Sequence, residues 1–189
     1  IKALGVDVHG MAPAIIARVE QARTEGRAVT ANQYPWEASG TSLTAALMPL
    51  WALDGGRAEL LKRLADPALA ERLRGEVAEN LRRRGGPGSL LVVEGRWQSQ
   101  RLDAIAAALK TDAVSAAIAA IREADAATVS FNMAERDIEA FMRQPWVMTG
   151  SDASTGHPRS WGSFARKHAV YVRERRVLTL RQFIDRSST

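Results

Sequence analysis

The most constraining feature of this sequence is a short apolar run that ends in a lone carboxylate. Residues 146–148 follow a proline and have the length and apolar character of a buried strand. Gly150 and Ser151 lead directly into Asp152, so the strand delivers a carboxylate at its carboxyl end. In α/β barrels and open α/β sheets, that edge of the sheet carries the chemistry. The pattern predicts an α/β fold with Asp152 at its functional end, although a turn or helix N-cap aspartate has the same spacing.

Helices and strands are expected to alternate near both ends of the chain. Pro13–Glu25 has the 3–4 apolar spacing of an amphipathic helix, and a β-favouring run follows at residues 28–31. Residues 128–131 are strand-like, residues 132–135 have the spacing of a capping box that opens a helix, and residues 163–175 are helical in pattern. A second capping box, Thr179-x-x-Gln182, opens the last helix.

A long and mostly helical segment separates these two regions. Asp66-Pro67 is a helix start, with an N-cap followed by proline at the first helical position, and this helix ends at Gly85-Gly86. Residues 89–94 are β-like, and two Ala-rich helices follow at 101–110 and 112–124. An insertion of about 85 residues is too long for a simple loop.

Several separated stretches of the chain resemble the N-acyl-D-amino-acid deacylases (D-aminoacylases) of the metal-dependent amidohydrolase superfamily. The family's Gly-Ser-Asp-Gly strand end matches residues 150–153, with Ala153 in place of the second glycine. Its His-Pro-Arg-x-x-Gly-x-Phe segment matches residues 157–164, and its Asp-Gln-Tyr-Pro-Tyr strand end is similar to residues 32–36. The downstream Tyr-Val-Arg-Glu and Leu-Thr-Leu stretches occur at 171–174 and 178–180.

The resemblance implies that the chain is the C-terminal portion of a (β/α)8 TIM barrel with a long, mostly helical lid insertion. Residues 1–38 would supply a helix and strand 7, residues 39–125 the lid, and residues 126–189 the last strands and helices. A complete barrel needs about 250 residues. The chain has 189, so we expect it to be a fragment whose partner is the remaining N-terminal part of the same protein.

Asp152 is expected to be the catalytic residue and a metal ligand. A metal-activated water needs a base that takes its proton and returns it to the leaving amine, and a carboxylate beside the metal does both. The resemblance gives Arg159 the task of holding the α-carboxylate of the substrate, for which its planar fork is suited. A solvated loop arginine is the alternative.

Three further residues are expected to bind substrate. Tyr34 matches a family tyrosine that contacts substrate, and its phenol suits a developing oxyanion. Lys2 matches a family lysine near the substrate carboxylate. Some family members have a serine where this chain has Gly40, and we expect the adjacent Ser39 to take its place. His157, like the other two histidines, is expected to be structural.

The predicted activity is zinc-dependent hydrolysis of small-molecule N-acyl-D-amino acids to a carboxylate and a free D-amino acid. A lone aspartate cannot hold zinc tightly, because stable sites need three or four ligands. The resemblance implies that the remaining ligands lie upstream of this chain, and the fragment alone is therefore expected to be inactive. The alternatives are another amidohydrolase, such as a dihydroorotase-like cyclic amidase, and a non-enzymatic helical adaptor. Arg159 in its His-Pro-Arg motif favours the linear deacylases.

Composition argues against two other classes of partner. The net charge is +5, but the basic residues are dispersed over helix ends with few aromatics beside them, which does not indicate a nucleic-acid surface. No run approaches the roughly 18 apolar residues of a membrane span. The sequence contains no cysteine, which excludes disulfides and thiolate metal ligands within it. A cytoplasmic location is expected.

Overall fold

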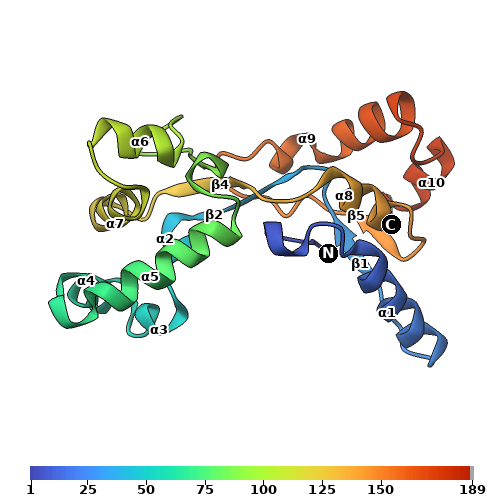
Figure 1. The fold of residues 1–189 in the computed structure, drawn as a ribbon. Coiled ribbons are helices and arrows are strands. Elements are labelled where there is room, and N and C mark those ends of the chain that lie inside the picture. Colours follow the sequence, from blue (N-terminus) through green and yellow to red (C-terminus); the bar gives the residue numbers. More distant parts are fainter. Residues whose placement is uncertain (188–189) are drawn as a thin grey trace. The chain divides into compact units, whose positions relative to one another are not determined.

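The computed structural model describes residues 1–187, which divide into two compact units that both contain helices and strands (Figure 1). Unit 1 joins Ile1–Ser39 to the stretch that begins at Met133, and unit 2 is Gly40–Asn132. The chain is therefore a mixed α/β protein. The assignment of residues 1–38 and 126–189 to a barrel and of 39–125 to a lid stays a prediction, and residues 188–189 lie outside the described part.

Unit 1 is built around two parallel strands covered by helices. Strand β1 pairs with β5 in parallel, with Ala31 opposite Val147 and Gln33 opposite Thr149. Its elements are η1 (Val6–Val8), α1 (Ala12–Thr24), β1 (Ala31–Gln33), α8 (Glu135–Met142), β5 (Val147–Thr149), α9 (Arg159–Arg166), the π-helical segment η3 (Lys167–Glu174) and α10 (Leu180–Asp185). The strand predicted at residues 28–31 begins only at Ala31, because pairing with β5 starts there.

Unit 2 contains a large apolar core and a small three-stranded sheet. Strand β2 (Ala38–Ser42) enters from unit 1, and the sheet order is β2-β4-β3, with β3 and β4 antiparallel. The other elements are α2 (Leu43–Leu47), α3 (Leu50–Leu53), α4 (Gly56–Ala65), α5 (Pro67–Arg83), η2 (Pro87–Ser89), β3 (Leu90–Val92), α6 (Leu102–Ala108), α7 (Ala113–Glu123) and β4 (Ala127–Phe131). The strand expected at 128–131 is present as β4, but it pairs with β3 rather than with β1 or β5.

Helix starts follow the sequence signals where the cap depends only on local residues. The Asp66 side chain accepts a hydrogen bond from the Ala68 N–H, as expected of an N-cap before Pro67. Thr179 and Gln182 form the predicted capping box of α10. In the part of the chain that the structure describes, no single helix is long and apolar enough to cross a membrane; α6 and α7, bent by 92°, meet that test only as a pair.

The capping box predicted at residues 132–135 is wrong. Helix α8 begins after Ala134, which makes no side-chain cap. The Glu135 carboxylate instead accepts a hydrogen bond from the Tyr171 hydroxyl at 2.6 Å and pairs with Arg175 at 2.7 Å. These partners lie about 40 residues along the chain, and their charge-assisted bonds outcompete a local cap.

A buried lysine was not anticipated. The Lys167 side chain is fully buried, and its Nζ donates to Thr149 Oγ1 at 2.8 Å, where Thr149 ends strand β5. Burial, together with the positive charge of Arg186, lowers the pKa of Lys167 to about 8. Burial away from water disfavours the charged ammonium, and the bond to the neutral Thr149 hydroxyl offsets only part of that cost.

This lysine makes stability depend on pH. Its pKa in the folded chain is about 8 against an ordinary value of 10.5, so the unfolded chain binds more protons between these values. The destabilising contribution of this lysine is therefore absent above pH 10.5, grows as pH falls from 10.5 to 8, and is fully present below 8. We expect the free energy of unfolding to rise by about 1 kcal/mol from pH 7 to pH 9. Urea unfolding should show this rise in the native sequence and not in Lys167→Met. The exposed Lys62→Met should keep it, and an identical pH dependence in Lys167→Met would contradict the assignment.

Candidate active site

The carboxyl ends of β1 and β5 bring four of the predicted site residues together. Because the two strands are parallel and in register, the residues that follow them emerge at one edge. The Gly150 N–H still donates to the Gln33 carbonyl, and a Cβ on Gly150 would approach Asn32 Cβ to 3.2 Å. Glycine at 150 therefore allows the close approach of the two strands immediately before Asp152.

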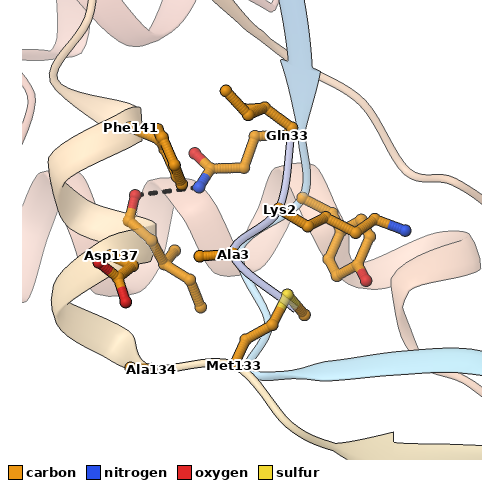
Figure 2. A pocket seen from close by; sticks show the side chains of 10 residues that line it. Lys2, Ala3, Gln33, Met133, Ala134, Asp137 and Phe141 are labelled. Atoms are coloured by element: carbon orange, nitrogen blue, oxygen red, sulfur yellow. Dashed lines mark hydrogen bonds between the residues drawn. The ribbon is translucent and has the colours of Figure 1, made fainter. Parts of the chain in front are cut away.

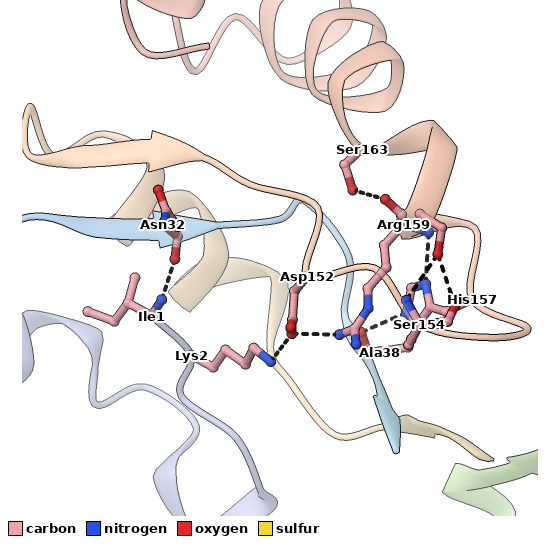
Figure 3. A network of polar contacts seen from close by, with 10 residues as sticks. Ile1, Lys2, Asn32, Ala38, Asp152, Ser154, His157, Arg159 and Ser163 are labelled. Carbon is pink, nitrogen blue, oxygen red and sulfur yellow. Dashed lines mark hydrogen bonds and ion pairs between the residues drawn. The ribbon is translucent and has the colours of Figure 1, made fainter. Parts of the chain in front are cut away.

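Asp152 stands at the centre of this cluster (Figure 3). Its Oδ2 atom lies 2.5 Å from Lys2 Nζ and 3.0 Å from Arg159 Nη1. Its backbone is left-handed, with φ at +48°, a conformation that aspartate adopts more readily than most residues. The side chain is 53% exposed, and all of these contacts use Oδ2. One carboxylate oxygen is therefore open to water or a ligand.

The neighbouring cations keep Asp152 ionised. Partial burial raises the pKa of this carboxyl, but the hydrogen bond and charge of Lys2 and the charge of Arg159 outweigh it and hold the pKa below its usual range. With two cations and one carboxylate, the cluster has a formal charge of +1, which favours an additional anionic group.

Arg159 and Tyr34 form the wall beside Asp152. The Arg159 side chain is 3% exposed, and its guanidinium carbon lies 4.7 Å from the centre of the Tyr34 ring. Lys2 Nζ lies 4.9 Å from the same ring, so the two cations contact one aromatic side chain. The Tyr34 hydroxyl is buried and has no hydrogen-bond partner among residues 1–187. An unpaired buried hydroxyl costs stability unless a ligand satisfies it.

The structure also corrects where Arg159 lies. The sequence places it in a loop before a helix at 163–175, but helix α9 starts at Arg159 itself. Its backbone N–H, which has no partner within the helix, donates to His157 Nδ1 at 3.0 Å. This bond depends on a side chain two residues earlier and starts the helix four residues sooner than the apolar pattern indicates.

The sequence did not indicate that His157 lies buried beside this cluster. It is 3% exposed, and its Nε2 lies 2.9 Å from the Ala38 carbonyl oxygen. Burial lowers the pKa of the imidazole, and the charge of Arg159 adds to this, although the hydrogen bond to Ala38 opposes them. Ser39, next to Ala38 in β2, is buried, and its expected contact with substrate stays a prediction.

The enclosed space beneath the cluster is too small for a substrate. Figure 2 shows it beside Lys2, Gln33 and Phe141, where the Gln33 amide donates to the Ile138 carbonyl at 3.0 Å. Its volume is about 10 Å³, the space of about one water.

The described residues do not form a complete metal site around Asp152. Among residues 1–187, no three His, Cys, Asp or Glu side chains come together as a metal site. Asp152 has one open carboxylate oxygen, and a zinc ion needs three or four ligands. Asp152 can therefore supply a ligand to a metal ion, but the described residues do not supply a complete ligand set.

A carboxylate at the carboxyl edge of parallel strands, flanked by cations and lacking a full ligand set, is consistent with part of an amidohydrolase site. No family model matches the chain. The chain is 40% identical over 85 residues to an N-acyl-D-glutamate deacylase from Alcaligenes xylosoxydans xylosoxydans, a match that covers 43% of this chain and 17% of that protein.

Solved structures of similar proteins match nearly the whole chain. A crystal structure of N-acyl-D-glutamate deacylase from Bordetella bronchiseptica, complexed with zinc and a phosphonate that mimics the tetrahedral intermediate, matches with a TM-score of 0.69 and 26% identity. This match covers 98% of the chain and 32% of that structure. A D-aminoacylase matches in fold with a TM-score of 0.64 and 21% identity over 96% of the chain and 31% of that structure. The chain is therefore similar in sequence to part of an N-acyl-D-glutamate deacylase and in fold to a D-aminoacylase, and it spans about a third of these structures.

Proposed function

We propose that this chain is the C-terminal barrel portion, with lid, of a zinc-dependent N-acyl-D-amino-acid deacylase. The observation that carries the proposal is the cluster in which Asp152 Oδ2 meets Lys2 and Arg159 beside the unpaired Tyr34 hydroxyl. Residues 1–38 and 126–189 are assigned to the barrel and residues 39–125 to the lid. The length spanned by the chain within its relatives supports a segment of a larger enzyme.

Asp152 is assigned the proton transfers of amide hydrolysis. Zinc, held by Asp152 and by ligands from the rest of the protein, would supply a Lewis acid that makes water nucleophilic near neutral pH. Asp152 removes the proton from the attacking water and delivers it to the departing nitrogen, which leaves as the free amine. The carboxylate is ionised and one of its oxygens is open, as a general base requires.

Arg159 and Lys2 are assigned to the α-carboxylate of the substrate. The cluster has one more cation than anion, and a carboxylate from the substrate would neutralise this excess. The buried guanidinium of Arg159 presents a planar pair of donors, which suits two carboxylate oxygens. The Tyr34 hydroxyl is assigned to the oxygen of the scissile amide, whose developing charge would satisfy this buried donor.

The direct test is an assay of the full-length enzyme against matched N-acyl-D- and N-acyl-L-amino acids, combined with its zinc content. We expect bound zinc, hydrolysis of the D-series and loss of activity after chelation that added zinc restores. A protein that binds no zinc and hydrolyses neither series would overturn the proposal.

The chain by itself is expected to be inactive. Among residues 1–187, no three His, Cys, Asp or Glu side chains come together as a metal site, whereas stable zinc sites have three or four ligands. Residues 1–189, purified alone, should therefore bind far less than one equivalent of zinc and should not hydrolyse an N-acyl-D-amino acid. Robust zinc-dependent hydrolysis by this piece would contradict the placement of the remaining ligands elsewhere in the protein.

A further inference from the structure

His157 connects the segment of Tyr34 to the helix that presents Arg159. Its Nε2 atom meets the Ala38 carbonyl oxygen at 2.9 Å, and its Nδ1 accepts the Arg159 N–H at 3.0 Å (Figure 3). The imidazole thus joins two segments about 120 residues apart in sequence. Both ring nitrogens therefore take part in hydrogen bonds, and the residue is only 3% exposed.

These two bonds define the state of the ring. Nδ1 accepts a hydrogen bond from an amide, so it carries no proton, and the proton must be on Nε2, which donates to Ala38. Only this neutral tautomer makes both bonds. A protonated ring would carry a donor at each nitrogen and would face the Arg159 N–H with a second N–H.

The same ring contacts the aromatic side chains that flank the cluster. Its centre lies 6.1 Å from that of Tyr34 and 5.6 Å from that of Trp36, both in edge-to-face geometry. Helix α9 is fixed to the same segment at a second point, where Arg166 Nε donates to the Pro35 carbonyl at 2.8 Å. The Arg159 guanidinium is therefore held over Tyr34 by contacts at both ends of its helix.

We propose that His157 is a positioning residue for carboxylate binding. This inference rests on the proposed function of Arg159. Its neutral Nδ1 fixes the first N–H of α9 and thereby directs the Arg159 guanidinium toward the substrate carboxylate. His157 does not touch substrate and takes no part in proton transfer. Loss of the Nδ1 acceptor should weaken binding of the carboxylate and leave the chemical step largely unchanged.

Two substitutions of His157 in the full-length zinc enzyme separate the two nitrogen atoms. Asn places an amide oxygen near the position of Nδ1 and keeps an acceptor for Arg159, whereas Gln places an amide nitrogen near Nε2 and keeps only the donor to Ala38. We expect His157→Gln to raise KM for an N-acyl-D-amino acid by about threefold to tenfold, with kcat little changed, since a neutral hydrogen bond is worth about 0.5–1.5 kcal/mol. His157→Asn should stay within about twofold of the native KM.

The controls isolate positioning from folding. An N-acyl amine that lacks the carboxylate should show no difference among the variants, and His168→Gln, which replaces a histidine that packs against Phe183, should leave KM unchanged. The inference is overturned if His157→Gln and His157→Asn raise KM equally, or if His157→Gln raises KM equally for both substrates. If His157→Gln does not fold, a tenfold rise in KM for His157→Asn still overturns it. A native enzyme that hydrolyses no N-acyl-D-amino acid refutes the proposed function, whereas an active enzyme with unchanged KM in His157→Gln refutes only the positioning.

Discussion

Replacing Asp152 by Asn is expected to lower kcat of the full-length enzyme by about 10²–10⁴-fold, the usual cost of losing a general base. An amide is nearly isosteric with the carboxylate, but it cannot accept the proton of the attacking water. Asp152 meets Lys2 and Arg159 through one oxygen and leaves the other open. The amide oxygen can keep contacts to these cations, so the shape of the cluster should survive the change.

Zinc content and folding should be measured beside kcat. We expect zinc to remain largely in place in Asp152→Asn, because the proposed function places the other ligands elsewhere in the protein. Asp185→Asn is a suitable control, since that carboxylate lies on α10 and is 63% exposed beside Arg181. It should retain native kcat. A near-native kcat in Asp152→Asn, with zinc bound, would exclude Asp152 as the base.

The proximity of Tyr34 and Asp152 could be predicted from the sequence. Parallel strands end at a common edge, so residues placed after β1 and β5 were bound to be neighbours once both strands were recognised. Tyr34 follows one strand and Asp152 the other. The resemblance added Lys2 and Arg159, and the structure places both against Asp152. Their roles toward substrate stay predictions.

Other features depended on contacts between distant parts of the chain. Asp137 was part of a helix in the sequence, but its buried carboxylate accepts hydrogen bonds from the N–H groups of Gly10 and Ala12, where α1 begins. Similarly, Lys167 lies within the stretch 163–175 that is helical in pattern, and its side chain is buried against Thr149 at the end of β5. Local periodicity cannot predict such partners, because it reports which face is apolar and not which polar group lies opposite.

Replacing Arg159 by Lys tests the substrate class. The substitution conserves the positive charge and should preserve an ion pair with Asp152, but an ammonium cannot reproduce the paired donors of a guanidinium. A charge-assisted hydrogen bond is worth about 1.5–3 kcal/mol, so kcat/KM for an N-acyl-D-amino acid should fall by roughly tenfold or more. Because the Arg159 side chain is only 3% exposed, water would not readily replace the missing donor.

The last helix supplies a matched control. Arg181→Lys changes an arginine on α10 whose side chain is 91% exposed, and it should leave KM nearly unchanged. The discriminating substrate is an N-acyl amine without a carboxylate. It should be a poor substrate for the native enzyme, because it cannot neutralise the cationic cluster, and Arg159→Lys should hardly alter its rate. If Arg159→Lys instead slows both substrates equally, then the guanidinium supports the fold around Tyr34 and does not bind the α-carboxylate, and the assignment to linear N-acyl-D-amino acids loses its main physical support.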